Sequence, residues 1–182
     1  HGNVWGIDDV VSLQYQTSLT KPGQVAVASA FYRHPVPGLK MVWDGYVAYS
    51  DVDGGTRNTA AGALSINGRG HLAGIRATWL LPRWGEVDHR VSLSLDRREY
   101  LNNCDIDGLP NDVCGAAGRD VAVTPLSLDY ALRGSAPFSW TLTLTALGNI
   151  KTGGSKASAE DFAQQRPDAK QNFGSFRLGS TA

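Results

Sequence analysis

The amino-acid sequence predicts an all-β protein, an antiparallel sheet of about eight strands in up-and-down order. Apolar and polar residues alternate with a period of two in segment after segment, and helical periodicity is nearly absent. Short turns rich in Pro and Gly alternate with long polar loops between these segments. At 182 residues the chain has the length of one ordinary domain. We therefore expect one structural unit, residues 1–182.

The clearest strand covers residues 138–146, in which aromatic and aliphatic side chains alternate with Ser and Thr. Residues 87–100 alternate in the same way, and one of their two faces carries charge throughout. Because successive side chains of a strand point to opposite sides, each segment has an apolar and a polar face. By the same pattern we expect strands at residues 10–19, 25–33, 39–50, 63–81, 121–132 and, incompletely, 172–180.

The alternation changes phase within residues 63–81, at the sequence Gly68-Arg69-Gly70. Glycine inside a strand pattern often marks a point where one extra residue is inserted into the strand. We therefore expect a bulge or bend there.

The connections between the strands differ in length in a regular way. Residues 34–38, 82–86 and 133–137 are short turns, whereas residues 51–62, 102–119 and 151–171 are long and polar. The first connection, residues 20–24, is short although it falls at the long-loop end. In an up-and-down sheet this alternation places short turns at one end and long loops at the other, as in outer-membrane barrels.

Aromatic residues gather near the ends of the predicted strands, as they do at the two interfaces of a membrane barrel. Near the long loops stand Tyr15, Tyr49 and Tyr100. Near the short turns stand Trp43, Trp79, Trp84, Tyr130, Phe138 and Trp140. We therefore predict an antiparallel up-and-down transmembrane β-barrel with an interfacial aromatic girdle. Alternation alone also permits a soluble barrel or sandwich whose apolar face points inward and binds an apolar ligand.

Composition excludes several classes of function. Seventeen basic and seventeen acidic residues give a formal net charge of +0, which argues against a nucleic-acid partner. The four histidines are scattered without metal-ligand spacing, so we expect no metal. There is no nucleophile elbow, phosphate-binding loop or dinucleotide fingerprint. We therefore expect no enzyme activity, no cofactor and no small-molecule substrate.

The polar face is the expected working surface. In a barrel its side chains would line the lumen, where a hydrated, charged wall lets a chain slide. The alternative is that the same charges form static cross-strand pairs that stabilise the wall, and the two roles are compatible. Arg90 and Arg98 are the strongest choices for lumen-lining residues. The full set of candidates is Arg76, Arg90, Asp96, Arg98 and Asp129.

Cys104 and Cys114 flank a stretch rich in turn-forming residues within a predicted long loop. Such a pair can close a small loop in an oxidising compartment, so we expect a disulfide on the outside of the cell. The alternative is two free thiols.

Several segments together resemble those of a known protein family. Residues 44–53, 68–70 with 80–82, 89–96 and 121–130 resemble, in order, the barrel of two-partner secretion transporters. These are the haemolysin and filamentous-adhesin secretion and activation proteins of the Omp85 superfamily. The resemblance covers nearly the whole chain. It rests on the residue pattern of the strands more than on any invariant motif. It implies a Gram-negative outer-membrane pore that exports one large partner exoprotein, with short turns in the periplasm and long loops outside.

The sequence departs from the complete family pattern. No POTRA domain precedes residues 3–9, which resemble the first barrel strand, and the Val-Arg-Gly-aromatic loop tip and a terminal strand ending in an aromatic residue are missing. Family barrels have about sixteen strands. We therefore expect the N-terminal half of a barrel, which forms a competent pore only if it closes on itself or pairs with another copy. The alternative is a small self-contained outer-membrane barrel with an adhesion or structural role.

Overall fold

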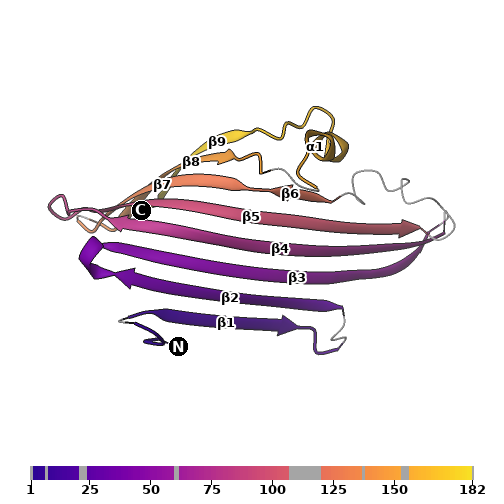
Figure 1. The fold of residues 1–182 in the computed structure, drawn as a ribbon, viewed down its shortest axis with the longest axis horizontal. Helices are drawn as coiled ribbons and strands as arrows, with labels where there is room; N and C mark the ends of the chain where they lie inside the picture. Colours follow the sequence, from indigo (N-terminus) through magenta and orange to yellow (C-terminus); the bar gives the residue numbers. More distant parts are fainter. Residues whose placement is uncertain are drawn as a thin grey trace.

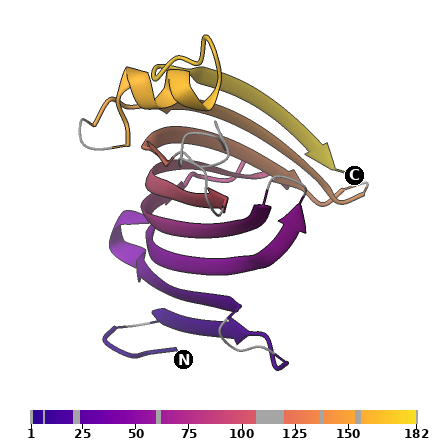
Figure 2. The same cartoon turned by 90° about the vertical axis from the view of Figure 1, so that its right-hand side faces the viewer.

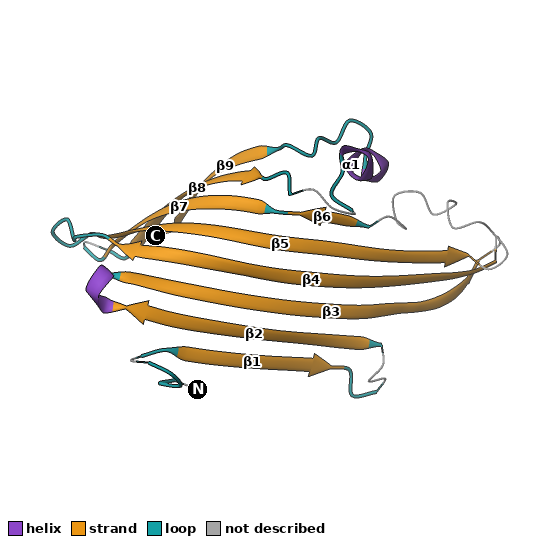
Figure 3. Cartoon of the chain, in the orientation of Figure 1, coloured by secondary structure: helices purple, strands orange, loops and turns teal. Residues whose placement is uncertain are grey.

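The computed structural model describes residues 2–6, 8–20, 24–59, 62–106, 120–136, 138–152 and 156–181. Side chains are described for all of these except residues 54–59, 62–67 and 103–106. The described residues form a single antiparallel sheet that is strongly curved and twisted (Figure 1 and Figure 2). One short α-helix lies beside the ends of the later strands, and a 3₁₀ helix, Pro37–Leu39, lies at the opposite end of the sheet (Figure 3).

Apart from β6, each strand pairs with the strands before and after it along the chain, which confirms the all-β, antiparallel, up-and-down prediction. The order across the sheet is β1-β2-β3-β4-β5-β7-β8-β9, and β6 also pairs with β5. The strands are β1 (Val10–Thr17), β2 (Val25–Val36), β3 (Met41–Thr59), β4 (Gly62–Leu80), β5 (Asp88–Ile106), β6 (Val121–Val123), β7 (Pro125–Gly134), β8 (Trp140–Asn149) and β9 (Gly174–Thr181).

The β3–β4 hairpin is longer than the sequence pattern predicts. Pairing continues to Thr59 opposite Gly62, so the prediction of a long loop at residues 51–62 is wrong. The residues there are mostly polar or Gly, and this composition is why the sequence predicts a loop. Backbone hydrogen bonds between the two strands do not depend on side-chain polarity, so the ladder extends past the last apolar residue.

The bulge is also in a different place from the one predicted. β4 pairs without interruption through Gly68 to Gly70 with both of its neighbours, and the irregularity falls in β3, between Asp53 and Thr56. The change of phase in the sequence therefore has another cause. Arg69 and His71 lie on the face that is apolar further along β4. That face simply becomes polar toward the long-loop end.

The segment predicted as one strand at residues 121–132 is divided into β6 and β7. At the interruption the Thr124 amide donates a hydrogen bond of 2.7 Å to the side-chain oxygen of Asn149. Ala122, in β6, is fully buried and its amide bonds to the carbonyl of Lys156. The long connection after β8 therefore packs back onto the sheet.

That connection contains α1 (Ala159–Gln165), which the sequence pattern did not predict. Ser158 caps the helix, because its hydroxyl accepts from the Asp161 amide at 3.1 Å while the Asp161 carboxylate accepts from the Ser158 amide at 2.8 Å. Phe162 is the helix residue that is buried. No helix among the described residues is long and apolar enough to cross a membrane.

The first and last strands are edges. β1 pairs with β2 and β9 pairs with β8, and within the described part of the chain they do not pair with each other. Figures 1 and 2 both place them at opposite ends of the sheet. The sheet of this chain is therefore open.

Candidate functional site

The two faces of the sheet are inverted relative to those of a water-soluble protein. On one face, here called the polar face, Asp44, Ser92, Ser94 and Asp96 are buried, and Ser94 is only 2% exposed. On the other, the apolar face, Leu93 remains 40% exposed although it is the immediate neighbour of Ser94. In water, burial normally selects the apolar side chains. The sequence of this chain therefore builds a sheet that leaves its apolar side uncovered.

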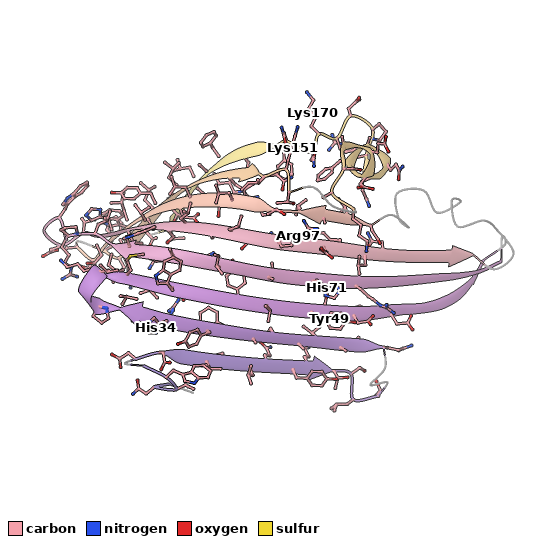
Figure 4. All side chains as sticks on the ribbon, in the orientation of Figure 1. His34, Tyr49, His71, Arg97, Lys151 and Lys170 are labelled. Carbon is pink, nitrogen blue, oxygen red and sulfur yellow. The ribbon has the colours of Figure 1, made fainter. Side chains whose placement is uncertain are left out.

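The apolar face is continuous from β1 to β9. Its described strand residues carry charge only toward the long-loop end. There Tyr49 donates to Asp51 at 2.9 Å, and Arg97 pairs with Glu99 at 3.0 Å. Figure 4 shows Tyr49, His71 and Arg97 near one another on adjacent strands. The apolar residues between these groups and the short turns include Val11, Leu13, Ala28, Ala30, Val47, Ala73, Ile75, Ala77, Val91, Leu93, Leu95, Leu126, Leu128, Leu142, Leu144, Ala146, Phe176 and Leu178.

The length of this apolar band along a strand follows from β5. Its apolar-face residues run uncharged from His89, near the short turn, to Arg97. At about 3.4 Å per residue, these two positions are separated by about 27 Å of strand. The strand length is that of a tilted transmembrane β-strand, which needs about 9–11 residues.

The structure places the aromatic residues predicted as a girdle at the short-turn end. Trp43 lies opposite Ala77, Trp79 opposite Val91, and Tyr130 also opposite Val91. Trp140 begins β8 opposite Gly134, where a Cβ would meet the indole ring. Trp84 lies in the turn between β4 and β5, and its backbone exchanges 3.0 Å hydrogen bonds with Val87.

His89 anchors this end of the sheet and was not singled out by the sequence. It is buried, its Nε2 lies 2.5 Å from the Pro82 carbonyl, and its Nδ1 lies 3.2 Å from the Tyr130 hydroxyl. The centroids of the Trp84 ring and the His89 imidazole ring are 4.3 Å apart. His89 is therefore a packing and hydrogen-bonding residue of the turn.

The polar face brings together the charged residues predicted to line a lumen. By register Arg76, Arg90, Asp96, Arg98 and Asp129 all lie on it. Asp96 accepts from Arg98 at 2.8 Å and from the Tyr46 hydroxyl. The Arg98–Asp96 ion pair therefore runs along β5, and the Nε of Arg98 is buried without a hydrogen-bond partner.

Arg76, Arg90 and Asp129 belong to a second group on the same face, around a hollow of about 430 Å³. Arg33 and Asp44, which the sequence did not single out, complete it: the guanidinium donates from Nε at 2.7 Å and from Nη2 at 3.2 Å to the two carboxylate oxygens. Alternation within the strands could have placed both residues on the polar face. Their pairing depends on the register between β2 and β3, which the sequence pattern does not specify.

Hydroxyl groups fill the polar face between the charges. Thr78 and Ser92 are hydrogen-bonded at 3.0 Å, and Ser94 and Ser127 at 2.6 Å. Thr145 donates to Asp129 at 2.5 Å. Each of these hydroxyl groups can also exchange its partner for a water molecule, because a hydroxyl both donates and accepts hydrogen bonds.

Two further predictions concern cysteine and metal. Cys104 belongs to β5, whereas Cys114 lies outside the described residues, so their disulfide stays a prediction. Within the part of the chain that the structure describes, no group of three His, Cys, Asp or Glu residues could hold a metal ion.

Comparison with known proteins adds no relative: no family model matches the chain, and neither does any curated protein or solved structure. The two faces of the sheet therefore carry the functional information.

Proposed function

We propose that this chain forms part of the wall of an outer-membrane β-barrel translocator of the two-partner secretion type, which exports a large exoprotein without a cofactor or ATP. The observation that carries the proposal is the inversion of the two faces. Exposed aliphatic side chains cover one side of the sheet, and buried Ser and Asp residues line the other.

A lipid bilayer explains the apolar face. Soluble monomers rarely expose continuous apolar patches of more than a few hundred Å². Within hydrocarbon the same surface is favourable, and the stretch from His89 to Arg97 has the 9 residues that a tilted transmembrane strand of about 9–11 residues needs. Charges at the long-loop end and aromatic side chains at the short turns fit the two interfaces. In this orientation the short turns are periplasmic and the long loops extracellular.

The polar face suits the wall of a hydrated lumen. Its ion pairs and hydroxyl pairs satisfy one another along the sheet, so the described part of this wall carries polar groups that can be hydrated where an unfolded chain passes. Passive conduction follows from such a wall, with the energy supplied by folding of the exported protein outside. The type of cargo rests on the resemblance of the strands to two-partner secretion barrels.

The open edges favour a larger barrel over a self-contained one. Unpaired backbone groups at β1 and β9 would be costly in hydrocarbon, where water cannot bond them. A barrel of this chain alone would need β1 to pair with β9, and the described strands lie at opposite ends of the sheet. We therefore propose that further strands, from the same protein or from another copy, complete the wall.

Photo-crosslinking in living cells tests this proposal. A crosslinking amino acid replaces Ser127 in one variant and Leu128 in the other, because these neighbours point to opposite faces of β7. During export of the exoprotein, we expect the variant at position 127 to crosslink to polypeptide and the variant at position 128 to crosslink to lipid.

The two variants control for each other, because they share one strand and one depth. Polypeptide adducts from both positions alike, or lipid adducts from position 127, would contradict the assignment of the faces. A lipid adduct at position 128 without any exoprotein adduct at position 127 would retain the membrane wall and exclude the translocator in favour of an adhesion or structural barrel.

A further inference from the structure

The hollow on the polar face contains more positive than negative charge. Its lining includes Arg33, Arg76 and Arg90, but only the carboxylates of Asp44 and Asp129. Six successive strands of the sheet, β2, β3, β4, β5, β7 and β8, contribute to it. The hollow is thus a built feature of the wall rather than a gap beside one side chain.

The charges differ in whether they are neutralised. Asp44 receives both hydrogen bonds of the Arg33 fork, so that pair is closed. Asp129 accepts from Thr145. Among the described residues, neither Arg76 nor Arg90 has a carboxylate within ion-pair distance, and both side chains are exposed. Two guanidinium groups therefore remain available.

Hydroxyl donors lie between the two available arginines. Arg76 is on β4 and Arg90 on β5, and the register places the Thr78–Ser92 pair between them. Thr143 lines the same hollow from β8. Guanidinium groups bind carboxylates and phosphates through two parallel hydrogen bonds, and nearby hydroxyls supply further donors. This donor set fits an oxyanion.

We propose that this hollow is an oxyanion-binding site, with Arg76 and Arg90 as its binding residues. The ligand chemistry is a carboxylate or phosphate group. In the translocator proposed above, on which this assignment of cargo rests, the site takes the acidic side chains of the passing polypeptide. Asp129, which also lines the hollow, repels the ligand and keeps binding weak enough for release.

Titration calorimetry tests the site. The full-length protein, purified in detergent and verified by far-UV circular dichroism, is titrated with inorganic phosphate, with an unstructured oligoglutamate peptide and with an oligolysine peptide. We expect the first two ligands to bind in competition with each other and the third not to bind. The double variant Arg76→Gln/Arg90→Gln should bind the anions at least about tenfold more weakly.

Arg177→Gln is the matched control, because Arg177 lies on the polar face of β9 but outside the hollow. An equal loss in this variant would mean general charge attraction and would overturn the site. Absence of binding by folded wild-type protein would also overturn it. Binding of phosphate but not oligoglutamate would leave a small-anion site and remove the polypeptide assignment.

The two proposals fail separately. Oxyanion binding without an exoprotein crosslink at position 127 would keep the site and reject the translocator. A crosslink without oxyanion binding would keep the translocator and reject the site.

Discussion

The Tyr46 hydroxyl on β3 hydrogen-bonds to the Asp96 carboxylate on β5, reaching across the whole of β4. Gly74, the residue of β4 that lies directly between them, makes this contact possible. A Cβ at position 74 would lie 2.5 Å from Asp96 Oδ1 and 2.6 Å from the Tyr46 ring. The hydrogen bond links β3 to β5 over β4 on the polar face, and it can form because Gly74 has no side chain in its path.

Gly74→Ala should therefore destabilise the sheet by about 1–3 kcal/mol, the usual cost of overpacking. Gly68→Ala, on the same face of the same strand, is the control, because nothing lies within 4 Å of its added Cβ. Urea unfolding in detergent or lipid measures both. Removing the ring as well, in Gly74→Ala/Tyr46→Ala, should relieve part of the clash. Equal stability of the two glycine variants would contradict the Tyr46–Asp96 contact.

Charge insertion should distinguish the two faces of β7. Leu128 is 50% exposed on the apolar face, in the middle of the band. Leu128→Arg should cost about 2–4 kcal/mol of stability in lipid, because the guanidinium enters hydrocarbon. Ser127→Arg should cost much less, because its side chain stays on the polar side. Refolding into lipid vesicles at increasing urea gives both values, and similar costs would mean that the apolar face does not meet lipid.

Acid should release the N-terminal segment from the sheet. Burial works to raise the pKa of Asp9, but hydrogen bonds from the Trp5 and Val4 amides and the Tyr32 hydroxyl outweigh it, so the pKa lies below its ordinary value of 3.8. Because the folded pKa is lowered, the stabilisation is fully present above pH 3.8 and is lost as the pH falls through the folded pKa.

The amide resonances of Val4 and Trp5 report this step in an acid titration by NMR. We expect a midpoint below 3.8 in the wild-type protein and no such step in Asp9→Asn. A midpoint at the ordinary value or higher would show that the three hydrogen bonds do not favour the ionised carboxylate.

The cysteine pair gives a prediction that depends on no described side chain. Peptide mapping without reductant should recover residues 104 and 114 in one linked peptide, which separates after reduction. Alkylation of both thiols before reduction would show that they are free and would remove the expected extracellular disulfide.

Much of the sheet could be predicted because alternation is a local property. The faces of β5 and β8 were assigned correctly, since a period of two needs only neighbouring residues. The ends of the strands were less predictable. β3 and β4 run on through the polar residues of their hairpin, where backbone pairing persists without an apolar face.

The candidate site divides in the same way. Alternation placed Arg76, Arg90, Asp96, Arg98 and Asp129 on one face. It did not indicate that Arg33 would be neutralised by Asp44 while Arg76 and Arg90 would not be, or that Gly74 would let Tyr46 reach Asp96. α1 was also missed, because a capped helix of 7 residues has too few turns to show periodicity.

The sequence by itself determined the strands, their antiparallel up-and-down order and the separation of apolar from polar side chains, because each follows from residues close together in the chain. Only the tertiary structure decided which face is left exposed and which charges find partners. Both depend on register and curvature, which bring together residues from strands far apart in the sequence. Alternation is the same in a soluble sheet and in an inverted one. The two kinds of sheet differ in exposure, and here Leu128 is exposed whereas Ser94 is buried.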